Sequence, residues 1–88
     1  MLEKQFTVPN KMGLHARPAA LFVQTASRFN SEVRVLKDGI EVNGKSVMGL
    51  MMLAAEFGSA LMVRIWGADE SKAMEAIQKI FDQKFLEA

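Results

Sequence analysis

The stretch that decides the fold is residues 32–42, which read EVRVLKDGIEV. Val33 and Val35 alternate with polar residues, which is the period-two pattern of a strand with one buried face. Asp38-Gly39 has the residue types of a two-residue type I′ turn, in which both central residues adopt a positive φ. Ile40 then continues the alternation. The stretch therefore predicts a β-hairpin.

Five further elements flank this hairpin. Period-two alternation predicts one strand over residues 2–8 and another over residues 61–66. Apolar residues at helical spacing predict a helix that begins at Pro18, because proline is tolerated where the first N–H groups have no intrahelical partner. Ser46 is expected to cap a short second helix that runs to about residue 55, and Asp69 is expected to cap a last helix.

The apolar positions of these segments predict the core and the architecture. The order β-α-β-β-α-β-α predicts an α+β fold, a two-layer open-faced sandwich in which three helices cover one face of a four-stranded, mostly antiparallel sheet. We expect residues 1–88 to form a single domain. The side chains expected to face the core from the helices are Ala19, Phe22, Val23, Ala26, Phe29, Leu50, Leu53, Phe57, Ala73, Ile77, Ile80, Phe81 and Lys84 or Phe85.

Composition excludes several classes of site. With no cysteine, disulfide scaffolds, zinc ribbons and thiol catalysis are excluded, and a single histidine argues against a metal site. The net charge of +1, from 11 basic and 10 acidic residues, supports neither nucleic acid nor an anionic membrane as a partner. The N-terminus lacks a signal-peptide pattern, and the longest apolar stretch, residues 47–55, is too short for membrane insertion. We expect a cytoplasmic protein without a cofactor.

Residues 13–20, Gly-Leu-His-Ala-Arg-Pro-Ala-Ala, carry the most chemical information. His15 lies just before a helix start, where free N–H groups and a partial positive charge favour anions. Arg17 adds a fork of donors suited to phosphate, and Gly13 leaves no side chain beside the imidazole. These residues suit a phosphoryl group held on imidazole. By spacing alone, an ordinary solvated loop histidine is the commoner case.

Residues 39–46, GIEVNGKS, match the nucleotide-binding pattern G-x-x-x-x-G-K-[ST] letter for letter. A P-loop follows a buried parallel strand, and its middle residues wrap around phosphates. Here the middle residues alternate like a strand, and Gly39 is needed for the hairpin turn. The chain is also short for an NTPase domain. We therefore reject a nucleotide site.

The octet resembles the active-site signature of the HPr family, the histidine phosphocarriers of the bacterial phosphotransferase system. Chain length, element order and a second motif around Ser46 agree with it. The resemblance implies that His15 accepts a phosphoryl group on Nδ1 from phosphorylated Enzyme I and passes it to enzyme IIA domains for sugar uptake. It further implies that Arg17 and the backbone amides of Ala16 and Arg17 hold the phosphate. Such a carrier has no independent turnover.

Residues 45–49, KSVMG, resemble the regulatory serine site of HPr proteins in bacteria that have an HPr kinase. The resemblance implies that phosphate on Ser46 weakens transfer from Enzyme I and can create a surface for a transcriptional regulator. A negative charge at a helix N-terminus is tolerated, so such a phosphate would act at a partner surface. The alternative is that Ser46 is only an N-cap, and both interpretations stay open.

A methionine cluster on the second helix suggests a docking face. Helical spacing points Met48 and Met52 away from the core, and exposed methionines form adaptable surfaces. Core filling is the alternative. In the HPr family the matching helix docks Enzyme I and enzyme IIA, and the expected interface on a monomer comprises Ala20, Gln24, Val47, Met48, Met51 and Met52.

Two other functions remain open at this level. One is a regulatory or nitrogen-branch HPr paralogue that acts through protein contacts, although His15 and Arg17 argue against a version without the active histidine. The other is an RNA-binding sheet domain, which shares the element order but needs exposed aromatic and basic residues on the sheet. Only Trp66 and Arg64 are candidates for that role.

Overall fold

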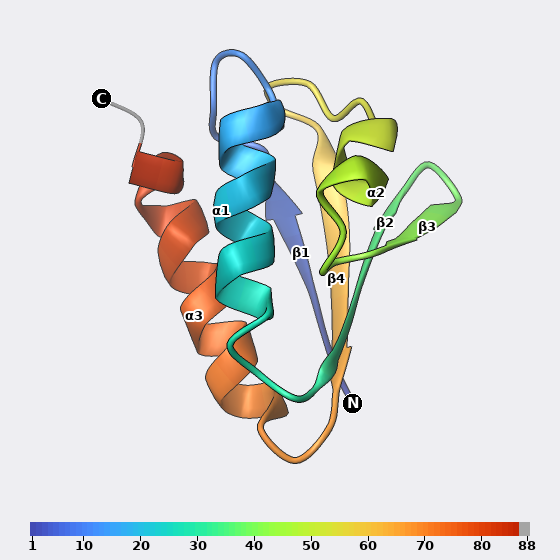
Figure 1. The fold of residues 1–88 in the computed structure, drawn as a ribbon. Coiled ribbons are helices and arrows are strands. Elements are labelled where there is room, and N and C mark those ends of the chain that lie inside the picture. The colour runs from blue at the N-terminus through green and yellow to red at the C-terminus, as the bar shows by residue number, and fades with distance from the viewer. Residues whose placement is uncertain (87–88) are drawn as a thin grey trace.

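The structure, a computed structural model, describes residues 1–86. It confirms the predicted order of elements and ends in a single 3₁₀ turn, η1 (Figure 1). The strands are β1 (Leu2–Thr7), β2 (Glu32–Lys37), β3 (Ile40–Asn43) and β4 (Ala60–Trp66), the helices are α1 (Ala16–Ala26), α2 (Val47–Met52) and α3 (Glu70–Asp82), and η1 is Lys84–Leu86.

The four strands form one sheet in the order β1-β4-β2-β3, and every neighbouring pair is antiparallel. The predicted hairpin is confirmed. Lys37 pairs with Ile40 across a two-residue turn, and Asp38 and Gly39 have φ angles of 50° and 81°, as a type I′ turn requires. The central strand β4 has Leu61, Val63 and Ile65 facing the core.

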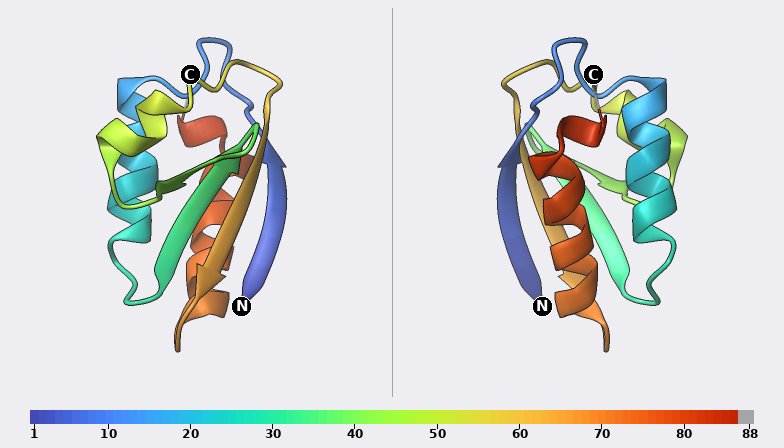
Figure 2. Two further views of the ribbon diagram at one scale, coloured as in Figure 1. Left: turned by 90° about the vertical axis from the view of Figure 1, so that its right-hand side faces the viewer. Right: turned by 90° about the vertical axis from the view of Figure 1, so that its left-hand side faces the viewer.

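All three helices cover the same face of the sheet, so the molecule has two layers (Figure 2). α1 contacts α3 on one side and α2 on the other (Figure 1). The loop from β1 to α1 and the loop from α2 to β4 meet at one end of the molecule, opposite the N-terminus. This end positions the candidate site.

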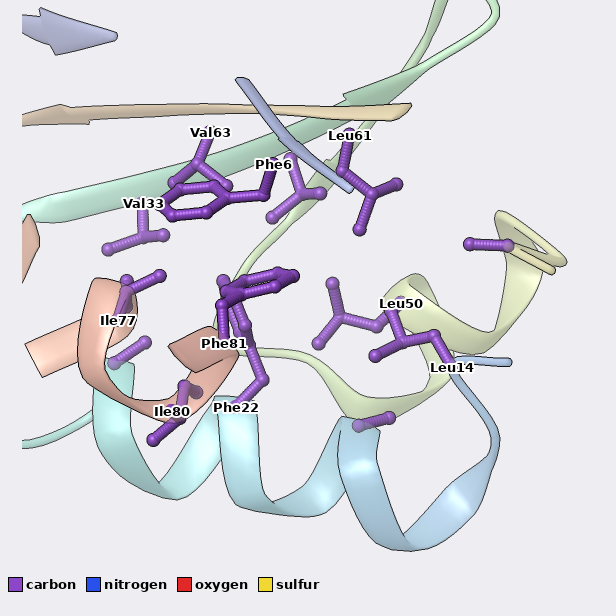
Figure 3. Close-up of a cluster of buried hydrophobic side chains, with 14 of the residues drawn as sticks. Phe6, Leu14, Phe22, Val33, Leu50, Leu61, Val63, Ile77, Ile80 and Phe81 are labelled. Atoms are coloured by element: carbon purple, nitrogen blue, oxygen red, sulfur yellow. The ribbon is translucent and has the colours of Figure 1, made fainter. Parts of the chain in front are cut away.

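Aromatic rings join the two layers (Figure 3). The Phe6 ring on β1 stacks on the Phe81 ring of α3 with centroids 4.3 Å apart, and Phe22 of α1 meets Phe81 edge to face at 6.3 Å. Nearly all of the predicted helical core residues are buried, while Val23 and Phe29 are partly buried against the cluster.

Three predictions about helix ends are wrong. α1 begins at Ala16 and not at Pro18. α2 ends at Met52, and Phe57 lies in the following loop with 64% of its surface exposed, not in the core. The chain leaves the helix because Ala54 adopts a left-handed φ of 50°. Phe85 is buried as predicted, but it belongs to η1, since α3 ends at Asp82.

Asp69 occupies the N-cap position of α3, but its side chain does not cap that helix. Its carboxylate accepts hydrogen bonds from the N–H groups of Asn30 and Ser31, at 2.9 and 3.0 Å, and from the Ser31 hydroxyl. The Ser31 hydroxyl, together with the N–H of Asn30, lowers the pKa of Asp69 below its ordinary value of 3.8. Asp69 therefore ties α3 to the start of β2.

The open face of the sheet carries charges of both signs. Arg64 pairs with Glu3 and, at 3.8 Å, with Glu41, and Arg34 pairs with Glu32 at 2.8 Å. These arginines are thus paired with carboxylates, whereas an RNA-binding sheet would use them to bind phosphates, which argues against that function. Among residues 1–86, no helix has the length and apolarity that a membrane span requires.

Candidate functional site: a histidine at a helix N-terminus

His15 is the N-cap residue of α1. Its backbone is extended, with φ −86° and ψ −167°, and its carbonyl accepts the first bond of the helix from the Ala19 N–H at 2.9 Å. The imidazole makes no capping hydrogen bond, and the residue is exposed. The His15 carbonyl therefore takes part in the helix, while the His15 ring makes no bond to the helix end.

The first turn of α1 leaves two amides available. Helix N-termini have four N–H groups without an intrahelical acceptor in the ideal case. Here the His15 N–H donates to the Gly13 carbonyl at 3.0 Å, and Pro18 has no N–H. Within the described part of the chain, the amides of Ala16 and Arg17 make no other hydrogen bond. These two donors are the ones that the resemblance assigned to phosphate.

Arg17 lies on the same first turn and is exposed. Across residues 1–86, neither its guanidinium nor the His15 ring takes part in an ion pair or side-chain hydrogen bond. A guanidinium without a carboxylate partner keeps its full set of donors for an incoming anion. The arrangement can hold a dianionic group beside the imidazole.

The loop between β1 and α1, which leads to His15, is fixed by hydrogen bonds to two other segments. Gly13 has a φ of 76°, and its N–H donates to the Asn10 carbonyl at 3.0 Å, while the Leu14 N–H donates to the Ala55 carbonyl at 2.8 Å. The buried Asn10 side chain donates in turn to the Lys84 carbonyl at 3.0 Å. The role of Asn10 could not be predicted, because nothing in the sequence signals a partner so far along the chain.

Gly13 is required at its position for a steric reason as well. A Cβ atom there would lie 2.6 Å from the backbone oxygen of Ala55, which is closer than real Cβ contacts come. The loop before α1 and the loop after α2 thus approach each other backbone to backbone. This contact places His15 beside the residues that follow α2.

Ser46 is the N-cap of α2, and its Oγ accepts a hydrogen bond from the Gly49 N–H at 3.0 Å. The neighbouring Lys45 ammonium donates to the Phe29 carbonyl at 2.7 Å. Residues 40–43 form strand β3, so the segment that matched the nucleotide-binding pattern is a strand and a turn. The structure agrees with the rejection of a nucleotide site.

The methionines of α2 point outward. Met48 and Met52 are 78% and 74% exposed and Met51 is 45% exposed, whereas Val47 is half-buried. Met51 lines a groove of about 570 Å³ together with His15. On α1, Ala20 is half-buried, and the exposed Gln24 lines a different groove, between α1 and α3. The structure therefore brings Met51 to His15 and places Gln24 at the edge of another surface.

Acidic and imidazole side chains are dispersed over the described residues. Among residues 1–86, no three of them lie close enough together to bind a metal ion.

A family model described as the PTS HPr component phosphorylation site matches residues 2–83 of the chain. The chain belongs to the HPr family. The HPr phosphocarrier of Xylella fastidiosa strain Temecula1 is 51% identical over 87 residues, which cover 99% of this chain and 98% of the relative.

Solved structures agree with this membership. The crystal structure of HPr-C-His from Thermoanaerobacter tengcongensis superposes with a TM-score of 0.95, at 46% identity, over 100% of this chain and 99% of the other. Crh of Bacillus subtilis, a protein of catabolite repression that was solved as a swapped dimer, has a TM-score of 0.75 at 45% identity, over 96% and 97% of the two chains. The fold is the HPr fold, and the family supports a phosphocarrier in the phosphotransferase system.

Proposed function

We propose that this protein carries a phosphoryl group on His15, which it accepts from phosphorylated Enzyme I and passes to enzyme IIA domains. One observation carries the proposal. His15 is an exposed N-cap that lies on the same helix turn as Arg17 and the amides of Ala16 and Arg17, and within residues 1–86 neither its ring nor these amides make a hydrogen bond. A phosphoryl group on the imidazole has donors within the same helix turn.

The proposed step is an in-line displacement at phosphorus. The Nδ1 lone pair of His15 forms a new N–P bond while the bond from phosphorus to the donor breaks, and the donor keeps the bonding electron pair. The amides of Ala16 and Arg17 and the Arg17 guanidinium offset the charge on the equatorial oxygens. Because the site is exposed, it holds the phosphate without trapping it, as reversible transfer requires.

Incubation with phosphoenolpyruvate and catalytic Enzyme I tests the proposal. We expect intact mass spectrometry to show one added phosphoryl group, labile in acid and absent from His15→Ala. Excess pyruvate with Enzyme I should remove it again, since a carrier is charged reversibly. A folded wild-type protein that takes up no phosphate would contradict the proposal.

Regulation through Ser46 is a further part of the proposal. We propose that an HPr kinase/phosphorylase can modify Ser46 and that the modified protein engages a transcriptional regulator. The half-buried Ser46 lies at the start of α2, whose outer face carries Met48 and Met52. A phosphate there would place negative charge at the edge of the methionine face.

The similarity to Crh favours a second candidate, a regulatory or nitrogen-branch protein that acts through contacts rather than sugar uptake. His15 and Arg17 are present in this chain, which supports transfer in either branch. Challenge of the phosphorylated protein with sugar-specific enzyme IIA and with a nitrogen-branch IIA separates the branches. Rapid loss of phosphate to only one of them identifies the branch.

We also propose that the protein works as a cytoplasmic, single-domain monomer. The carrier role requires the surface around His15 to be free for successive partners. Sedimentation of the purified protein checks the oligomeric state, because Crh of Bacillus subtilis shows that this fold can be exchanged between two chains. A dimer at working concentration would contradict the monomer.

A further inference from the structure

A second groove lies between α1 and α3, which run side by side in opposite directions (Figure 1). Its volume is about 620 Å³, and residues of α1, α3 and η1 line it. Within the described part of the chain, this groove shares no lining side chain with the groove that contains His15. It is therefore a separate surface from the groove at the proposed phosphoryl-transfer site.

The charges that line this second groove are mostly positive. Arg28, Lys72 and Lys79 are cations, and Glu75 is the one carboxylate among the lining residues. Three positive charges and one negative charge give the groove a net charge of +2, although the whole chain has a net charge of only +1. Within residues 1–86, none of these four side chains takes part in an ion pair. The groove is therefore complementary to an acidic partner.

Apolar side chains line the groove as well. Leu21 of α1 and Ala76 of α3 are half-buried, and Leu86 of η1 is 68% exposed. Along α3, Ala76 lies between the two lysines of the groove. A partner element that matches this lining is apolar on the side that meets Leu21 and Ala76 and acidic at its flanks.

The shape of the groove favours a helix as this element. Its described walls are helical, so they offer no strand edge to pair the N–H and C=O groups of an extended segment, whereas a helix brings its own backbone bonds. From Lys72 to Gln83 the α3 wall is about 16 Å long, which equals about three helical turns. An amphipathic helix of that length presents one apolar stripe and two charged flanks.

We propose that the groove between α1 and α3 docks an acidic amphipathic helix of a partner protein. Arg28, Lys72 and Lys79 pair with its carboxylates, while its apolar face covers Leu21 and Ala76. This inference goes beyond the proposed carrier function, because it adds a second attachment point on a different face of α1. A partner held there leaves the His15 groove accessible.

A designed peptide serves as the probe. It has about 18 residues, enough to form a helix, with leucine at helical spacing and glutamate and alanine elsewhere, and its matched copy has glutamine in place of every glutamate. In fluorescence anisotropy, the glutamate peptide should bind at least about fivefold more tightly than the glutamine peptide. Equal affinities would overturn the proposal. Binding to anionic phosphatidylglycerol vesicles without binding to the peptide would indicate a lipid surface and would also overturn it.

A pair of double variants tests the place of binding at constant net charge. Arg28→Gln with Lys79→Gln removes two cations of the groove and should raise the Kd of the glutamate peptide about fivefold. Lys11→Gln with Lys37→Gln removes two cations elsewhere, one at the His15 groove and one on β2, and should keep the wild-type Kd. Equal weakening in both double variants would mean unspecific attraction by charge and would overturn the groove.

Nitrogen-15 NMR and a charging assay complete the test. The bound peptide should shift the amide signals of Leu21 and Ala76 and leave those of Leu14 and Met51 in place; the reverse pattern would overturn the proposal. Enzyme I should charge the peptide-bound protein as fast as the unbound protein, and competition between peptide and Enzyme I would contradict a separate attachment point. Failure of Enzyme I to charge the unbound protein counts against the carrier function alone, because peptide binding is measured without it.

Discussion

At the scale of single residues, backbone conformation sets what the side chains of the site can do. Gly13 adopts a φ of 76° and touches the Ala55 carbonyl, so His15 follows at a defined place. The pattern Gly-Leu-His-Ala-Arg-Pro identifies the residues, but the contact of Gly13 with the second loop is a tertiary feature. It could not be predicted, because no local pattern shows which distant carbonyl the glycine meets.

Gly13→Ala should disrupt both the fold and the site. The left-handed φ costs an L-residue about 1–2 kcal/mol, and the clash with Ala55 adds to that cost. Gly39→Ala is the control, because Gly39 has a φ of 81° but nothing within 4 Å of the added Cβ. In urea unfolding, we expect Gly39→Ala to lose only the free energy that the left-handed φ costs. We expect this variant to be phosphorylated like the wild type. Equal loss in the two variants would show that the contact with Ala55 is unimportant.

The Asp69 carboxylate should make stability depend on pH. Hydrogen bonds from Ser31 and Asn30 lower its folded-state pKa below the ordinary value of 3.8, so the unfolded state takes up its proton first as the pH falls. This contribution is fully present above the unfolded pKa and is lost as the pH falls through the folded pKa. We expect the unfolding free energy of the wild type to fall more steeply than that of Asp69→Asn as the pH is lowered from about 5 to about 2.

Urea unfolding at each pH checks the Asp69 prediction. Glu70, whose pKa is lowered by a hydrogen bond from the Gly67 N–H and by the N-terminal amine, titrates in both proteins and cancels in the comparison. If the unfolding free energies of the wild type and Asp69→Asn fell in parallel with pH, the Asp69 prediction would be contradicted. The sequence placed Asp69 correctly at a helix start but could not show that its carboxylate bonds across to Ser31.

At the scale of elements, α2 is too short to form without support. It spans six residues, well below the length at which isolated helices persist in water. Its stability comes from the Ser46 cap and from Leu50 and Leu53, which pack into the core. Ser46 as a capping residue predicted the start of this helix correctly. Hydrophobic spacing misplaced its end, because Phe57 continues the apolar pattern after the chain has turned.

Substitutions of Ser46 should separate capping from regulation. Ser46→Ala removes the acceptor for the Gly49 N–H and should cost about 1 kcal/mol in urea unfolding, while leaving transfer from Enzyme I intact. Ser46→Asp keeps a capping oxygen and adds negative charge at the helix start, so it should retain stability. If Ser46 is regulatory, Ser46→Asp should slow transfer. Wild-type transfer rates in Ser46→Asp would leave Ser46 as a cap alone.

Met48→Asp tests whether α2 docks the donor. Met48 is 78% exposed in the first turn of α2, where a carboxylate is favourable to the helix, so the fold should be retained. A charge in an apolar contact should raise the KM for transfer from Enzyme I about tenfold or more. Met48→Leu should keep the wild-type value. Equal KM values for the aspartate and leucine variants would remove Met48 from the interface.

At the scale of the whole molecule, the site depends on segments that are far apart in sequence. The loop before α1, the loop after α2 and the turn after α3 meet through Leu14–Ala55 and Asn10–Lys84 hydrogen bonds. Element order and layers followed from periodicity, because buried faces repeat locally. The strand order β1-β4-β2-β3 follows from packing of the whole chain, and with it the meeting of these loops at one end (Figure 1).

The carrier role also fits the size of the molecule. Its single aromatic-centred core joins the two layers, while the chemistry lies on an exposed helix end that needs no closed cleft. In the proposed role, an exposed His15 beside the methionines of α2 lets a small protein present the same phosphoryl group to successive partners. The fold therefore presents His15 on an exposed helix end and does not enclose it.

NMR of the protein charged by Enzyme I and phosphoenolpyruvate tests the central claim most directly. Nitrogen-15 and phosphorus-31 spectra should show one phosphorus bonded to Nδ1 of His15, with shifted amide signals for Ala16 and Arg17. The phosphorus signal should disappear when enzyme IIA is added. A phosphate on another residue, or a phosphohistidine with unshifted Ala16 and Arg17 amides, would contradict the account.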